Sequence, residues 1–148
     1  MTLRSAQQIA DWYLAWSSDQ DAGLDNLKLQ KLLYYTQGHA LGERGSRVFS
    51  DEIQAWVHGP VVPAVYRRFK SYGGNPIDAE AELPETFDWD DYRDIEDFLQ
   101  QVWNTYAKYA SWTLRNMTHS EAPWSQHFNA DERSATIPVS TLQAHFGK

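Results

Sequence analysis

Hydrophobic residues recur at helical spacing along much of the chain, which predicts a mainly α-helical protein. In residues 5–17 they have the spacing of an amphipathic helix, and Ser5 is available to cap its first turn. In residues 24–41 they nearly encircle the helix axis, so this helix is expected to lie at the centre of the fold. Residues 89–109 carry apolar positions three and four apart and predict the strongest amphipathic helix of the chain.

Glycine and proline mark the boundaries in the middle of the chain. Residues 48–59 alternate enough to suggest one or two short strands. The residues expected on one face of these strands are Ile53, Ala55 and Val57. A helix is expected next, started by Pro60 or Pro63 because proline is tolerated in a first helical turn, and it runs to Tyr72 before Gly73 stops it.

Short helices near residues 111–120 and 139–146 complete the expected fold. With 148 residues and 42% hydrophobic content, the chain is long enough to form one domain with its own core. We therefore predict that residues 1–148 form a single mainly α domain. It is expected to be a compact helical bundle of about five to seven helices with one short β-hairpin or strand pair.

Composition limits the cellular compartments and the classes of partner that the protein can have. The chain has no cysteine, so it has neither a disulfide framework nor a thiolate metal site, and nothing argues for an oxidising compartment. It contains no apolar run of signal-peptide length and none of the roughly 20 residues that a membrane span needs. We expect a soluble cytoplasmic protein with no membrane partner.

The formal charge of −7 is concentrated in one segment, residues 78–97, where ten acidic residues face Arg93 alone. One interpretation is a solvated acidic connection, and the other is a patch that steers a basic partner. Such a dense acidic run argues against a protein surface wrapped around nucleic acid, because phosphates need a basic footprint.

Few residues offer chemistry. His119 and Glu121 have a spacing that could place two ligands near one ion if His39 or His58 lies close by, which would suit a metal-dependent hydrolase. Alternatively, His119 caps a helix end and Glu121 holds a turn. Motifs for a serine nucleophile, a phosphate-binding glycine loop, a dinucleotide site and a zinc protease are all missing. We expect no cofactor and no enzymatic activity.

A second alternative is a DNA-binding regulator. It would need a basic helix that enters the major groove, and only one helix offers such residues. They are Arg67, Arg68 and Lys70.

Three blocks of sequence together resemble the signature of a known family. They are LDNLKLQKLLYYTQGHAL, FSDEIQAWVHGPVVPAVYRRFKSYG and LRNMTHSEAPW. Their combination and order are similar to those of the Panacea-domain family, the SocA-like antitoxins, also known as GepA-like phage-associated proteins. The resemblance extends over roughly residues 7–146.

The resemblance implies a compact, mainly helical antitoxin that neutralises a toxin encoded by the adjacent gene, usually by direct protein contact. In the SocA case the protein instead acts as an adaptor that delivers the toxin to a ClpXP protease. Family members pair with very different toxins, so the resemblance implies an antitoxin role but does not identify the toxin. Some members carry an appended DNA-binding domain, which we do not expect here.

The family motifs correspond to a definite set of residues. In the first block they are Lys28, Gln30, Lys31 and Tyr35; in the second, Trp56, Gly59, Pro60, Pro63 and Tyr66; in the third, Thr118, His119, Glu121, Pro123 and Trp124. Turn geometry alone explains the glycine and the prolines of the second block. The residues we expect to bind the partner are Lys28, Lys31, Tyr35, His39, Trp56, Tyr66, Arg67, His119 and Trp124.

Overall fold

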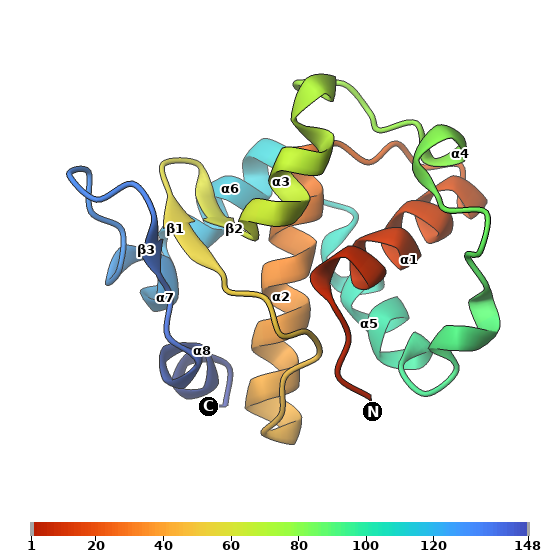
Figure 1. Cartoon of the computed structure of the whole chain (residues 1–148). Helices are drawn as coiled ribbons and strands as arrows, with labels where there is room; N and C mark the ends of the chain where they lie inside the picture. Colours follow the sequence, from red (N-terminus) through yellow and green to blue (C-terminus); the bar gives the residue numbers. More distant parts are fainter. Residues whose placement is uncertain (1, 148) are drawn as a thin grey trace.

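One helix, α2 (Asn26–Arg44), runs through the centre of the computed structural model, which describes residues 2–147 (Figure 1). The elements packed around it are α1 (Ala6–Asp19), α3 (Pro63–Phe69), α5 (Glu96–Tyr106), α6 (Ser111–His119), α8 (Val139–Phe146) and a small β-sheet. Apart from the half-buried Leu27, the leucines, tyrosines and alanine of α2 are buried, and so are Thr36 and Gln37. The central position predicted for this helix is confirmed.

Local side-chain hydrogen bonds define where the first two helices begin. Ser5 caps α1: its Oγ accepts from the Gln8 N–H, and the Ser5 N–H donates to Gln8 Oε1 at 2.9 Å. The Asp25 carboxylate caps α2 by accepting from the Lys28 N–H at 2.8 Å. Helix α2 ends at Gly45, whose φ of 71° is the left-handed conformation that favours glycine.

The sheet is three-stranded, antiparallel and ordered β2-β1-β3. Its strands are β1 (Gln54–Trp56), β2 (Gly59–Val61) and β3 (Ala135–Thr136). Pro60 therefore pairs with Ala55 in the sheet, and α3 starts at Pro63, the second of the two predicted starts. Val57 lies in the turn between β1 and β2 and is 59% exposed, so it does not share a face with the buried Ile53 and Ala55 as predicted.

The acidic segment passes around the outer side of α1 (Figure 1). It contains one turn of helix, α4 (Ala79–Glu82), and a 3₁₀ turn, η2 (Trp89–Tyr92). The helix predicted over residues 89–109 was wrong in its first part, because the chain turns after η2 and the α-helix begins only at Glu96.

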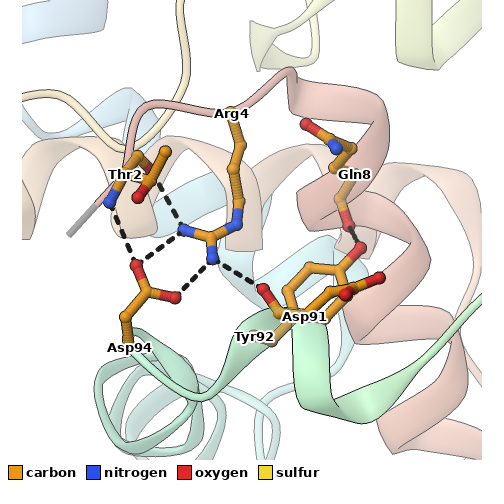
Figure 2. Close-up of polar contacts among 6 residues, drawn as sticks. All are labelled: Thr2, Arg4, Gln8, Asp91, Tyr92 and Asp94. Atoms are coloured by element: carbon orange, nitrogen blue, oxygen red, sulfur yellow. Dashed lines mark hydrogen bonds and ion pairs between the residues drawn. The ribbon is translucent and has the colours of Figure 1, made fainter.

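Contacts with the N-terminal residues account for this interruption (Figure 2). The Arg4 guanidinium forms an ion pair with Asp94 and also donates to the Asp91 carbonyl at 2.8 Å. The Tyr92 hydroxyl donates to the Gln8 carbonyl in α1 at 2.8 Å. Hydrogen bonding from Arg4 lowers the pKa of Asp94 to about 2. This end of the acidic segment is therefore fastened to the N-terminal residues.

Helix α8 packs against α2 at a pair of glycines one turn apart. A Cβ atom built on Gly38 would overlap the ring of Phe146, and one built on Gly42 would overlap the backbone of the same residue. The absence of a side chain at both positions lets the two helices approach closely. Helix α8 has the bounds that the sequence pattern predicts, residues 139–146.

The mainly α fold class is confirmed. The described residues contain eight α-helices, more than the predicted five to seven, because α4 and α7 (Ala122–Ser125) are single turns. No helix within residues 2–147 combines the length and apolar character that crossing a membrane requires.

Candidate functional site

A buried lysine joins the first two sequence blocks. Lys31 of α2 has no exposed surface, and its Nζ donates to the Pro60 carbonyl of β2 at 2.9 Å. Burial lowers the pKa of Lys31 to about 7, and the nearby charge of Arg115 lowers it further while that of Asp25 opposes the shift. The hairpin lies so close that a Cβ on Gly59 would be 2.6 Å from Lys31 Cε.

This burial predicts a specific pH dependence of stability. Because Lys31 binds its proton more weakly in the folded state than in the unfolded chain, the free energy of unfolding should rise between pH 7 and pH 10. The limiting slope for one group is about 1.4 kcal/mol per pH unit. Lys31→Met should remove this slope, as measured by urea unfolding at pH 7, 8 and 9.

The exposed Lys108→Met is the matched control and should leave the pH dependence as it is in the natural protein. If Lys31→Met and the natural protein follow parallel curves over this pH range, Lys31 does not carry the effect.

A second chain of hydrogen bonds also starts on α2. The Val62 N–H, at the end of the hairpin, donates to Gln30 Oε1 at 2.9 Å. Gln30 Nε2 donates to Asn26 Oδ1 at 2.9 Å, and Asn26 Nδ2 donates to the Tyr66 carbonyl of α3 at 3.1 Å. The polar residues of this buried stripe therefore hold β2 and α3 at fixed positions on the central helix.

The third block holds the hairpin from its other side. The Trp124 Nε1–H donates to the Trp56 carbonyl at 2.7 Å. The Trp124 ring stacks on His119, with centroids 3.7 Å apart and planes 6° from parallel, and also on Phe128. Burial lowers the pKa of His119, and the charges of Arg115 and Lys31 add to that shift. The hairpin backbone is thus hydrogen-bonded to both α2 and α7.

Glu121 connects the turn between α6 and α7 to the aromatic residues of α2. Its two carboxylate oxygens accept from the Tyr34 and Tyr35 hydroxyls, each at 2.9 Å. Burial raises the pKa of Glu121, while the two tyrosine hydroxyls lower it. The Tyr35 ring stacks on Tyr106 at a centroid distance of 3.8 Å, and the Tyr106 hydroxyl is 2.6 Å from His39 Nε2. This network spans α2, α5 and α7.

The nine residues predicted to bind a partner differ in exposure. Lys31 and Tyr35 are buried, and only Arg67 is exposed. The half-buried ones are Lys28, His39, Trp56, Tyr66, His119 and Trp124. Lys28 Nζ donates to the Ala107 carbonyl, so this lysine ties α2 to the end of α5. A partner contact at these nine positions stays a prediction.

The described residues add no support to the two alternatives, a metal site at His119 and Glu121 and a DNA-binding helix. In residues 2–147 no three His, Cys, Asp or Glu side chains gather in a group that could hold a metal ion. Both oxygens of Glu121 already accept hydrogen bonds from tyrosines. On the basic helix, Arg68 is half-buried and pairs with Asp11 at 2.8 Å, which leaves Arg67 and Lys70 as its exposed cations.

The structure also shows an exposed apolar surface that the sequence interpretation missed. Val57 is 59% exposed and Trp112 is 55% exposed. The His58 ring lies 5.4 Å from that of Trp112, and the Arg115 guanidinium covers the Trp112 ring at 4.5 Å. The available signal was that Val57 lies two residues before Gly59, a turn-forming residue, and that Trp112 falls off the apolar spacing of its helix.

Trp56 and Val57 line two clefts. The first has a volume of about 290 Å³ and also includes Leu27, His58, Tyr66 and Lys70 in its walls. The second has a volume of about 430 Å³ and is lined by Trp56, Val57, Phe128, Ala130 and Arg133. We call the two clefts, together with Trp112 and Arg115, the hairpin face.

Three separate sequence blocks thus enclose one β-hairpin in a mainly helical fold. The chain belongs to the SocA-like Panacea-domain family: the model of the antitoxin SocA-like Panacea domain matches residues 29–125. The protein is also 30% identical to Antitoxin SocA of Caulobacter vibrioides (strain NA1000 / CB15N), over 80% of this chain and 68% of that relative. No solved structure gave a significant match.

Proposed function

We propose that this chain is an antitoxin that neutralises a cognate protein toxin, encoded by the adjacent gene, through direct contact in the cytoplasm. The observation that carries the proposal is the likeness to Antitoxin SocA over 80% of the chain. The mechanism would be occlusion, in which a rigid folded surface covers the part of the toxin that acts. A standard interface of this kind buries about 800 Å² on each partner.

Several motif side chains point into the protein and are already hydrogen-bonded there, which favours a binding protein over an enzyme. Lys31 donates to Pro60, Trp124 donates to Trp56, and Glu121 accepts from two tyrosines. A general acid or base must reach the proton it transfers on a substrate. Each of these groups is instead hydrogen-bonded inside the protein, Lys31 and Trp124 to the hairpin backbone and Glu121 to two tyrosines of the central helix.

The test is expression of the neighbouring gene with and without this chain in a bacterial host. Expression of the neighbour alone should arrest growth, and co-expression should restore growth and give a stable complex on co-purification. A neighbour that is harmless when expressed alone would remove the main support for an antitoxin role.

A second arm separates occlusion from delivery to a protease. Under occlusion, co-expression should restore growth equally in a host that lacks the ClpXP-type protease, and the amount of toxin should not fall. If rescue requires the protease and the toxin disappears, the chain acts as a proteolytic adaptor.

A further inference from the structure

We infer that the hairpin face is the surface that binds the toxin, and that it recognises an apolar side chain flanked by carboxylates. This inference rests on the proposed antitoxin function. It shares Trp56 and Tyr66 with the contact that the family motifs suggest but centres it on Val57 and Trp112, because most other motif side chains are occupied within the fold.

The first argument is the shape of the surface. Two clefts with mostly apolar walls share Trp56 and the exposed Val57 in their linings. A small ligand in either cleft would leave the neighbouring cleft and the exposed Trp112 uncovered. A folded protein can cover all three at once, and tryptophan is among the residues that contribute most at such interfaces.

The second argument is charge. The cations that border the hairpin face are Lys70, Arg115 and Arg133, and within residues 2–147 none of them forms an ion pair with a carboxylate. Asp131 and Glu132 precede Arg133 in its loop, yet neither lines a cleft. The acidic segment lies on the opposite side of α2, around α1 (Figure 1). Uncompensated cations beside apolar clefts fit a partner with carboxylates around an apolar anchor.

The third argument is rigidity. The turn is held by the Trp124 bond to the Trp56 carbonyl at 2.7 Å and by the Lys31 bond to the Pro60 carbonyl at 2.9 Å. The Trp56 ring also packs edge-on against Tyr66, with centroids 5.0 Å apart. Because the backbone of the hairpin is already fixed, little conformational entropy is lost when a partner binds.

The test measures the affinity of the purified chain for the product of the neighbouring gene. Val57→Glu places a carboxylate at a position that lines both clefts, and Trp112→Ala removes the exposed ring; each should weaken binding at least about tenfold. Val139→Glu, at a position that is 43% exposed on α8, is the matched control and should bind like the natural protein. Circular dichroism and thermal unfolding check that all three variants fold.

The outcomes separate this inference from the proposed function. If the natural chain does not bind the neighbour's product, the antitoxin proposal fails and this inference fails with it. If the natural chain, Val57→Glu and Trp112→Ala all bind alike, only the hairpin face is excluded. Salt-sensitive binding of the upstream duplex DNA that Val57→Glu abolishes, with toxin binding intact, would assign the surface to nucleic acid and overturn the inference.

Discussion

Gly59→Ala should destabilise the protein by about 3 kcal/mol or more, a large part of the roughly 5–15 kcal/mol that holds a typical domain folded. Gly59 has a φ of 109°, and the new Cβ would lie 2.6 Å from Lys31 Cε and 2.8 Å from Thr118 Oγ1. Backbone strain at such a φ costs about 1–3 kcal/mol, and forcing atoms into a packed interior costs a similar amount. Urea unfolding at pH 7 measures the loss.

Gly73→Ala is the matched control for the backbone term. Gly73 also has a positive φ, 58°, but a Cβ there would meet nothing within 4 Å. Its ψ of −128° lies outside the left-handed helical region, so this variant should lose about 1–3 kcal/mol from backbone strain alone. Equal losses in the two variants would show that contact with Lys31 and Thr118 adds nothing, and that the hairpin is not tightly packed on α2.

Gly38→Ala should destabilise the protein although alanine is the better helix former by about 1 kcal/mol. The added methyl group would overlap the ring of Phe146, so α8 must shift away from α2. Overpacking of this kind costs about 1–3 kcal/mol beyond the helix preference. Thermal and urea unfolding of the variant, compared with the natural chain, measure the net change.

A double-mutant cycle with Phe146→Leu identifies the cause. In the Phe146→Leu background the clash is relieved, so Gly38→Ala should be neutral or stabilising. Should Gly38→Ala cost the same in both backgrounds, the close approach of α8 to α2 is not what requires glycine.

Much of the fold follows from local pattern. The Ser5 cap, the central position of the second helix and the bounds of α8 were predicted from spacing and capping preferences, which act within a few residues. The predicted helix over residues 89–109 failed at its start because Arg4, about ninety positions earlier, binds Asp94. A contact between such distant positions leaves no trace in local periodicity.

In the candidate site, too, the local pattern was predictable and the long-range contacts were not. The sequence identified Lys31 and Tyr35 as members of family motifs, but burial depends on which backbone carbonyls and carboxylates the fold brings to them. Lys31 is enclosed because the Pro60 carbonyl accepts its hydrogen bond, and Tyr35 because Glu121 lies opposite. The exposure of Val57 follows from the two-residue turn, whose register the alternation of strand residues did not fix.

The residues that hold the hairpin in place are different from the residues that it exposes to solvent. Lys31, Gln30 and Trp124 hold the hairpin through its main-chain atoms, at Pro60, Val62 and Trp56. Hydrogen bonds to main-chain atoms do not depend on which side chains the turn residues carry. New specificities could therefore arise by exchanging a few outward residues while the supporting framework stays the same.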